Sequence, residues 1–494
     1  MAKLHSDLQN KEFWYKDITL ITNRLPDFER DEVDLTTIFT KRIRLKTPFV
    51  SAPMDTVTEA EMAIVMALYG GIGVIHYNFP TIDRQIEEAE KVKKFEAGFV
   101  FNPVVLSSQN NIGDVCRVNE KYGFFSVPVT ADGTLNSKLL GIVTHRDIRY
   151  RTDMAAKLSE VMTPRDKLIV AKKSETIDKD DLDLANKIIK QNNLDTLIVV
   201  DEQDRVAALV TDSDLRKNEQ YPLATKDENK QLRTFIAVES RLNLAKERIA
   251  RASAAEIDGI VIDASVVFKE QIEIAKFAKE NFPDLDVVLG NVGSADMVKE
   301  IMEQGFPYCD AIKIGIGPGA ACITQQELGT GRAQASAVWD CAQEAKRLEP
   351  KYGFMPLIAD GGIKIVDVAG AGIAKPGDIG KALALGAQTV MMGSVLAGLD
   401  EAPGEQEFDY KENMMVKKYR GMGSLEAMES TSAVRYAVDR QKVRIPEGVV
   451  TKVPYRGSGY DFLPKLIVGV KQSLQKQGFR NIKQLQEEAD IRPI

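Results

Sequence analysis

The stretch GIVIDASVVFKEQIEIAKFAKENFPDLDVVLGNVGS, residues 259–294, contains two short apolar runs with a helical segment between them. Each run is almost continuously apolar and ends in Asp, Asn or Ser, which is typical of a parallel strand buried on both faces. The residues between the runs alternate between apolar and charged with the period of an amphipathic helix. The stretch therefore predicts a strand–helix–strand unit with a parallel pair of strands.

Apolar runs of this kind recur along the chain, most of them separated by helical segments. The eight predicted strands lie near residues 47–55, 71–78, 234–240, 259–265, 286–294, 311–319, 356–362 and 389–394. Eight such strands favour an α/β fold of the (β/α)₈ TIM barrel type, with an open parallel sheet as the alternative. In a barrel the functional residues lie on the loops after the strands, where Gly, Asp, Ser and Cys cluster in this sequence.

A second module interrupts the barrel between its second and third strands, which are too far apart for one crossover helix. This region contains a repeat, because GIVTHRDIRYR at 141–151 and ALVTDSDLRKN at 208–218 share the pattern V-T-x-x-D-[IL]-R. We therefore predict an insert at residues 104–222 between barrel segments at 1–103 and 223–494.

The repeat resembles tandem cystathionine-β-synthase (CBS) domains, which commonly bind adenine or guanine nucleotides. The resemblance implies that Thr144, Asp147, Thr211 and Asp214 contact the ribose of such an effector. The alternative is purely local, because a threonine caps the following helix and an aspartate in its first turn stabilises that end.

The composition excludes several classes of protein and partner. The chain has 494 residues, 44% of them hydrophobic and 28% charged, with a net charge of −7, which argues against a disordered, collagen-like or coiled-coil protein. Basic and acidic residues are interspersed, so nucleic acid is not expected as the main partner. Glycine and polar residues interrupt every long apolar stretch, so no membrane span is expected.

The number and positions of the histidines and cysteines limit the catalytic mechanisms and the cellular location that we expect. The three histidines all lie in the first third of the chain, which leaves almost nothing for a histidine-based triad or a multi-histidine zinc site. The four cysteines form no C-x-x-C pair and no disulfide framework, which favours a reducing, cytoplasmic location.

The segment GIGPGAACIT, residues 315–324, is the strongest candidate for a reactive loop. Its glycines allow the backbone to approach a ligand closely, and carbonyl groups of such a loop could coordinate a monovalent cation. Cys322 on this loop, with Thr324 two residues later, is a candidate nucleophile. The alternative is a small buried thiol, which is what we expect of Cys116, Cys309 and Cys341.

Motifs distributed over nearly the whole chain resemble those of one enzyme family. They are SAPMDTVTE at 51–59, GIGPG-x-x-CIT at 315–324, ADGGI at 359–363, MMGS at 391–394, KKYRGMGSLEAM at 417–428, Arg435-Tyr436, and PEGV at 446–449. In content and order they resemble the inosine-5′-monophosphate (IMP) dehydrogenase family. The resemblance implies oxidation of IMP to xanthosine monophosphate with NAD, in guanine nucleotide biosynthesis. It implies attack of Cys322 on C2 of the purine, hydride transfer to NAD and hydrolysis of the thioimidate.

The resemblance also implies roles for individual residues and a mobile flap near residues 400–450. The implied catalytic residues are Cys322, Thr324, Arg435, Tyr436 and Glu447, with Arg435 as the base for hydrolysis. The implied substrate ligands are Ser51, Met54, Asp360, Gly362, Gly393, Ser394, Tyr419, Met422, Gly423 and Glu447. Asp263, Ser265, Asn291 and Gly315 would contact NAD, and the carbonyls of Gly317, Gly319 and Cys322 would bind K⁺. A homotetramer or octamer is expected.

The sequence departs from the family pattern at four places. Asp263-Ala264-Ser265-Val266-Val267 stands where the family has Asp-Ser-Ser-Gln-Gly, and Ala320 stands where it has a phosphate-binding serine. The stretch after Ile363, KIVDVAGAGIAKPGD, is longer than usual and rich in glycine and alanine, and the C-terminal Glu-Gly-Gly segment is missing. These departures concern NAD, phosphate and K⁺ binding rather than the nucleophile.

Two alternative functions stay open at this point. GMP reductase uses the same covalent chemistry with NADPH, and TGRAQASAV at 330–338 resembles its loop. A relative that binds purine nucleotides without turnover is the other. Arg435-Tyr436 and PEGV favour the dehydrogenase, because a reductase needs no hydrolytic flap.

Overall fold

The computed structural model describes residues 2–22, 24–95, 100, 103–179, 182–211, 220–363, 365–366, 373–429 and 445–494. The chain divides into two compact units. The barrel unit comprises Met1–Val92, Leu223–Thr225 and Arg233–Ile494, and the insert unit comprises Lys93–Pro222 and Lys226–Leu232.

Eight parallel strands close the barrel, as the sequence predicted. Around the barrel their order is β14-β15-β16-β17-β18-β21-β5-β6. Their bounds are β5 Phe49–Ser51, β6 Ile72–Ile75, β14 Thr234–Val238, β15 Gly259–Asp263, β16 Asp286–Val292, β17 Ala311–Ile314, β18 Leu357–Asp360 and β21 Thr389–Met392. All eight coincide with predicted strands, so the (β/α)₈ barrel is confirmed and the open sheet is wrong.

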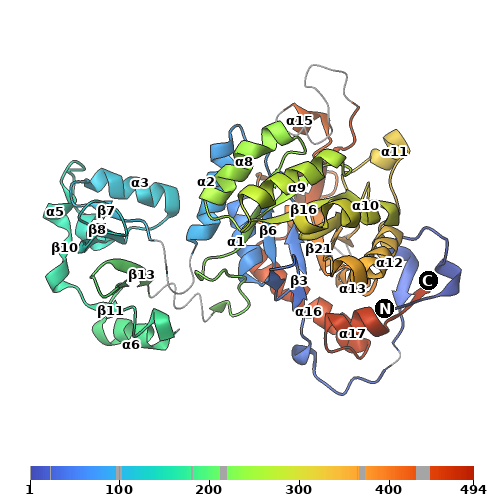
Figure 1. The fold of residues 1–494 in the computed structure, drawn as a ribbon, viewed down its shortest axis with the longest axis horizontal. Coiled ribbons are helices and arrows are strands. Elements are labelled where there is room, and N and C mark those ends of the chain that lie inside the picture. The colour runs from blue at the N-terminus through green and yellow to red at the C-terminus, as the bar shows by residue number, and fades with distance from the viewer. Residues whose placement is uncertain are drawn as a thin grey trace. The chain divides into compact units, whose positions relative to one another are not determined.

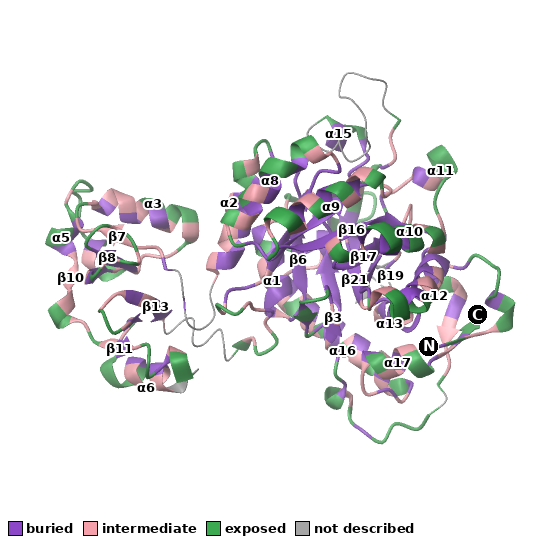
Figure 2. Ribbon diagram, in the orientation of Figure 1, coloured by how far each residue is buried: buried purple, intermediate pink, exposed green. Residues whose placement is uncertain are grey.

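Helices surround the strands of the barrel unit (Figure 1). The longer ones are α1 Ala60–Leu68, α2 Ile82–Lys94, α8 Leu242–Ala254, α9 Lys269–Asn281, α10 Ala295–Gly305, α12 Gln334–Tyr352, α13 Pro376–Ala384, α16 Gly459–Lys476 and α17 Ile482–Glu488. Figure 2 shows buried strands inside this ring and exposed residues on the outer faces of the helices. None of the described helices is both long enough and apolar enough to span a membrane.

Small sheets and short helices decorate the barrel unit. The sheets are β1 Lys3–Leu4 with β25 Asp490–Pro493 and β2 Ile18–Leu20; β3 Thr37–Ile38 with β4 Arg44–Leu45; β19 Ile365–Val366 with β20 Ile373–Ala374; and β22 Gln406–Asp409 with β23 Met414–Arg420 and β24 Val450–Pro454. The short helices α11 Thr324–Leu328, α14 Ser394–Ala397 and α15 Leu425–Met428 each begin on a loop that carries a predicted motif.

The insert unit contains two sheets that share an apolar core. One has the order β10-β9-β8-β7 and the other β11-β12-β13. Their bounds are β7 Leu106–Ser107, β8 Val127–Thr130, β9 Leu139–Val143, β10 Thr163–Pro164, β11 Val170–Lys172, β12 Thr196–Val200 and β13 Val206–Thr211, with helices α3 Ile112–Tyr122, α4 His145–Ile148, α5 Leu158–Val161 and α6 Leu182–Asn192. Leu139 and Ile142 of the first sheet pack with Ile198 and Val200 of the second.

The interior of the barrel changes from apolar to polar along the strands. Phe235, Val261, Val288 and Ile358 belong to one buried cluster inside the barrel, and Phe39 packs edge-on against Phe235 with ring centroids 5.0 Å apart. Beyond this cluster, toward the C-terminal ends of the strands, the buried side chains are Asp263 and Lys313, with Asp360 partly buried. The apolar layer therefore supports a polar layer at the end where function is expected.

Phe235→Ala should destabilise the barrel unit by about 3–5 kcal/mol, because it removes a fully buried ring at the centre of the barrel. Chemical denaturation followed by circular dichroism would measure the free energy of unfolding. Phe408→Ala on β22 is the matched control, since the Phe408 side chain is exposed. Equal effects of the two substitutions would contradict the placement of Phe235 in the core.

Candidate active site

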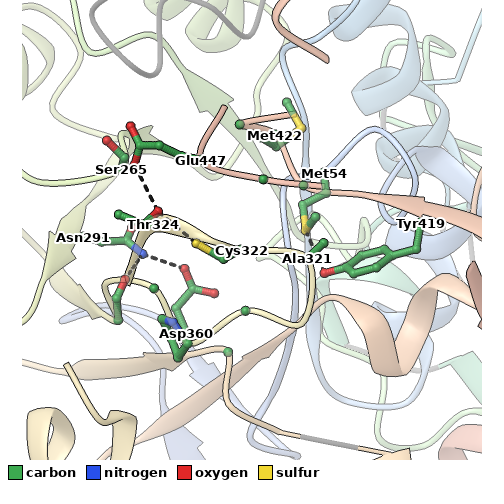
Figure 3. Close-up of a pocket in the computed structure, with 18 residues that line it drawn as sticks. Met54, Ser265, Asn291, Ala321, Cys322, Thr324, Asp360, Tyr419, Met422 and Glu447 are labelled. Carbon is green, nitrogen blue, oxygen red and sulfur yellow. Dashed lines mark hydrogen bonds between the residues drawn. The ribbon is translucent and has the colours of Figure 1, made fainter. Parts of the chain in front are cut away.

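A cleft opens at the C-terminal ends of the barrel strands, and residues from seven separate segments line it (Figure 3). Thirteen of the predicted site residues line it: Met54, Ser265, Asn291, Gly315, Gly317, Gly319, Cys322, Thr324, Asp360, Tyr419, Met422, Gly423 and Glu447. Pro318, Ala321, Gly361, Gly421 and Gly448 complete the wall. Residues distant in sequence thus meet at the end of the barrel where the fold predicts a functional site.

The loop between β17 and α11 presents Cys322 to this cleft. Gly317 adopts a left-handed conformation with φ of 82°, which favours glycine, and the Cys322 amide donates a hydrogen bond to the Gly319 carbonyl at 3.1 Å. At Gly315 the chain lies directly against the backbone of Asp360, so that a side chain there would overlap it. The glycines therefore let the loop after β17 turn tightly and lie against the end of β18.

A chain of hydrogen bonds connects the thiol to a carboxylate. The Thr324 hydroxyl donates to Glu447 Oε2 at 3.0 Å, and Cys322 Sγ lies 3.1 Å from Thr324 Oγ1 (Figure 3). Since the threonine proton is directed at Glu447, the free lone pair of Thr324 Oγ1 can accept the thiol proton. The geometry thus provides a path that moves a proton from Cys322 toward Glu447.

The backbone around Glu447 fixes this chain in place. The Ile323 amide donates to the Glu447 carbonyl at 2.9 Å, and the Val449 amide donates to the Ala321 carbonyl at 2.9 Å. The two segments therefore pair like short antiparallel strands, with Cys322 opposite Gly448. This pairing brings residues from the PEGV motif to the reactive cysteine.

Asp360 lies on the floor of the cleft and is held by two donors. Lys313 Nζ is 2.7 Å from Asp360 Oδ2, and Asn291 Nδ2 donates to the same oxygen at 2.9 Å. Asn291 Nδ2 also donates to the Gly315 carbonyl at 2.6 Å. A carboxylate with one oxygen engaged in this way can offer the other to hydroxyl groups of a ligand.

Two residues of this arrangement were missed by the sequence analysis. Lys313 is fully buried on β17, and Gln334 is fully buried at the start of α12, where its amide donates to the Ile314 and Asp360 carbonyls at 2.9 and 3.2 Å. A lysine at an inward position of the strand AIKI was the available signal for Lys313. Gln334 lies within TGRAQASAV at 330–338, the segment that resembles the GMP reductase loop.

Tyr419 forms the opposite wall with Met54, and its hydroxyl is 3.5 Å from Met54 Sδ. Burial raises the pKa of Tyr419 above its ordinary value, and the negative charges of Asp360 and Cys322 raise it further. A side chain at Gly393 would collide with the Tyr419 hydroxyl, which places this phenol directly beside the MMGS motif. Tyr419 is therefore a neutral hydrogen-bond donor close to the N-terminal end of α14.

Some predicted residues do not line the cleft. Ser51 is fully buried, and its Oγ accepts a hydrogen bond from the Thr58 hydroxyl at 2.9 Å, so its role as a ligand stays a prediction. Asp263 is also fully buried, since it lies two residues after the inward-facing Val261 on β15, and its carboxylate lies 3.3 Å from Lys313 Nζ. Gly362, Gly393 and Ser394 lie next to wall residues. Arg435 and Tyr436 lie outside the described residues.

The remaining cysteines fit the expectation of structural thiols. Cys309 and Cys341 are fully buried, and burial raises the pKa of each thiol to about 12. Cys116 is partly buried and packs against the apolar core of the insert unit. Cys322 alone among the four cysteines lines the cleft.

In the insert unit, the predicted nucleotide contacts have local partners. The amide and the hydroxyl of Thr144 both donate to Asp147 Oδ2 at 2.7 Å at the start of α4, which is the capping geometry of the alternative interpretation. Thr211 ends β13 and pairs with Thr196 of β12. Asp214 lies outside the described residues.

Comparisons with known proteins agree with these motifs. The family model for the IMP dehydrogenase / GMP reductase domain matches residues 12–494. Relatives named inosine-5′-monophosphate dehydrogenase include those of Schizosaccharomyces pombe, 41% identical over 94% of this chain and 85% of the relative, and Aquifex aeolicus, 40% identical over 93% and 88%. A crystal structure of GMP reductase from Trypanosoma brucei in complex with guanosine 5′-monophosphate is 27% identical with a TM-score of 0.82, covering 99% of this chain and 96% of that one.

Alkylation with iodoacetamide should modify Cys322 in the folded protein and leave Cys309 and Cys341 unmodified. The two buried thiols lack access, and their raised pKa keeps them protonated even at a pH above the ordinary thiol value of 9.0. Peptide mass spectrometry would identify the sites, and the unfolded protein, in which all four cysteines react, is the control. Modification of Cys309 before Cys322 would contradict the assignment.

Proposed function

This chain belongs to the IMP dehydrogenase / GMP reductase family, and we propose that it oxidises IMP to xanthosine monophosphate with NAD through a covalent intermediate on Cys322. Relatives at 36–41% identity over nearly the whole chain are named inosine-5′-monophosphate dehydrogenase, so the enzyme is an oxidoreductase of this type in guanine nucleotide synthesis. The observation that carries the proposal is the chain of hydrogen bonds Cys322–Thr324–Glu447 in the cleft beside Asp360.

The first step requires a thiolate at Cys322. Its proton would pass to Thr324 while the threonine proton passes to Glu447, along the two hydrogen bonds of 3.1 and 3.0 Å. The thiolate would then form a bond to C2 of the purine, and the hydrogen on C2 would leave with its electron pair. NAD, when bound, supplies the acceptor for this hydride.

The second step releases the product and restores the thiolate. A water molecule would add to C2 of the thioimidate while the C–S bond breaks, and its proton needs a base. We assign this base to Arg435 on the sequence resemblance, with Thr324 and Glu447 as a second route. An arginine can accept a proton only when its cationic form is disfavoured by desolvation or by neighbouring charges.

Binding groups surround the cysteine on several sides. Asp360 would accept hydrogen bonds from the ribose hydroxyls, since its carboxylate faces the cleft. The Tyr419 hydroxyl, with the amides of Gly362, Gly393 and Ser394, would bind the phosphate. Met422 and Gly423 would contact the base from the wall that carries them.

The cofactor and a cation would bind next to the same loop. Ser265, Asn291 and Gly315 line the cleft, and they would contact NAD there. The carbonyls of Gly317, Gly319 and Cys322 would supply oxygen donors, the ligand type that suits K⁺. The Gly319 carbonyl also accepts the Cys322 amide, and its second lone pair can serve a cation.

We propose a regulatory role for the insert at residues 104–222, as tandem CBS domains that bind an adenine or guanine nucleotide. The support is the repeated V-T-x-x-D-[IL]-R pattern and the pair of sheets with a shared core. The family resemblance supports a homotetramer or octamer, and the cysteine pattern supports a cytoplasmic location.

The purified enzyme should reduce NAD in the presence of IMP, and Cys322→Ala and Cys322→Ser should lower turnover at least ~10³-fold, because neither side chain supplies a comparable nucleophile. The nicotinamide absorbance measures both. Cys341→Ala is the control and should retain turnover. The GMP reductase in the comparisons makes GMP with NADPH the competing assay. Turnover with GMP alone would replace the dehydrogenase by a reductase, and turnover with neither would favour a non-catalytic nucleotide-binding relative.

Arg435→Ala should slow hydrolysis more than hydride transfer, because it removes the proposed base for water and leaves the nucleophile intact. Mixing this variant with IMP and NAD should give a burst of NADH followed by a slow steady state, measured by stopped-flow absorbance. Arg347→Ala, at an exposed arginine paired with Glu344 on α12, is the control and should change neither phase. An unchanged steady-state rate in Arg435→Ala would refute the assignment of the base.

A further inference from the structure

We infer that Lys313 is a positioning residue that orients the Asp360 carboxylate toward the substrate ribose and links it to the cofactor side of the cleft. The inference rests on the proposed function, because that function makes Asp360 the ribose ligand. It adds a residue that contacts neither substrate nor cofactor and acts through its neighbours.

The first observation is the direction of the donors. Lys313 Nζ and Asn291 Nδ2 both approach Asp360 Oδ2, at 2.7 and 2.9 Å. No hydrogen bond joins Asp360 Oδ1 to another of the described residues, and Figure 3 shows this oxygen turned away from Asn291. Two donors on one oxygen fix the carboxylate in a single rotation, with the other oxygen available to a ligand.

The second observation is the burial and charge of the group. Lys313 is 0% exposed, and it also lies 3.3 Å from Asp263 Oδ1 and donates to Asn291 Oδ1. An ammonium group at such a position needs carboxylate partners, because an isolated buried charge is strongly disfavoured. The Lys313 ammonium group therefore connects Asp360, proposed to bind the substrate, with Asp263 and Asn291, proposed to bind the cofactor.

The third observation is that the barrel makes room for this side chain. Lys313 alternates with outward-facing neighbours on β17, and it points into the barrel above the apolar layer that contains Ala311. A side chain at Gly290 would lie 2.7 Å from Lys313 Cβ. The absence of a side chain at residue 290 thus allows β16 to lie close to the backbone of β17 at Lys313.

A purely structural role is the competing explanation, because a buried cation can serve only to neutralise carboxylates. Lys313→Met leaves two carboxylates without their cation and should reduce both stability and substrate binding. Lys313→Met/Asp263→Asn restores the single net negative charge of the wild-type cluster but not the donor to Asp360. The double variant therefore separates charge balance from positioning.

Lys279→Met is a matched control at the other end of the strands. Lys279 Nζ lies 2.6 Å from Asp310 and 3.7 Å from Asp286, so it is also a largely buried lysine between two carboxylates. Asp286 begins β16 and Asp310 precedes β17. Its loss should lower the melting temperature without changing the affinity for IMP.

The experiment uses the full-length enzyme and three measurements. The first is the melting temperature. The second is a comparison of KM for IMP with kcat at saturating NAD. The third is the protection that bound IMP gives Cys322 against alkylation with iodoacetamide, which needs no turnover. We expect Lys313→Met to weaken protection and raise KM at least ~10-fold, since a charge-assisted hydrogen bond no longer fixes Asp360. In the double variant the melting temperature should recover while KM and protection stay impaired.

Two results would overturn the inference: full recovery of IMP affinity in the double variant, or unchanged IMP affinity in both Lys313 variants. If the single variant does not fold, the double variant alone decides. Failure of the proposed function has a different signature, because the wild-type enzyme itself would then not reduce NAD in the presence of IMP.

Discussion

Closure of the parallel barrel is the constraint on which the site depends. Every strand runs in the same direction, so all the C-terminal ends reach one rim, and residues that follow different strands meet there. Asn291, Gly315 and Asp360 lie at the C-terminal ends of three successive strands of the chain and are joined by hydrogen bonds. The chemistry of the cleft is therefore assembled by topology, with no local sequence motif that contains all its members.

The reactive loop adds a second constraint, which comes from far along the chain. Residues 321–323 pair with residues 447–449 through backbone hydrogen bonds, and this pairing brings Glu447 to Thr324. A thiol on a glycine-rich loop would otherwise have few restraints, because glycine loses much conformational freedom when it is ordered. Residues 447–449 contribute the Glu447 carboxylate. Their backbone hydrogen bonds to residues 321–323 also hold this carboxylate at a fixed position relative to Cys322.

The sequence was sufficient to predict the eight strands, because parallel strands buried on both faces are nearly continuous apolar runs. The glycine-rich loop and Cys322 were also predictable, since that composition suits neither a helix nor a strand. The sequence analysis did not predict a role for Lys313, because its partners Asp263, Asn291 and Asp360 lie on three other strands and meet it only in the folded barrel. The role of Ser51 was predicted from its motif alone, and the sequence did not predict that its hydroxyl is bonded to Thr58. For Thr144 and Asp147, the local cap was the simpler interpretation, and the structure has that geometry.

The shared cation has a consequence for the thermodynamics of binding. Lys313 is joined to Asp360, proposed for the substrate, and to Asp263 and Asn291, proposed for the cofactor. A ligand that changes the position or charge of one partner changes the interactions available to the others. Linkage then requires that substrate and cofactor alter each other's affinity by the same factor, in whichever order they bind. Under the proposed roles of these residues, the buried lysine would couple the binding of substrate to the binding of cofactor.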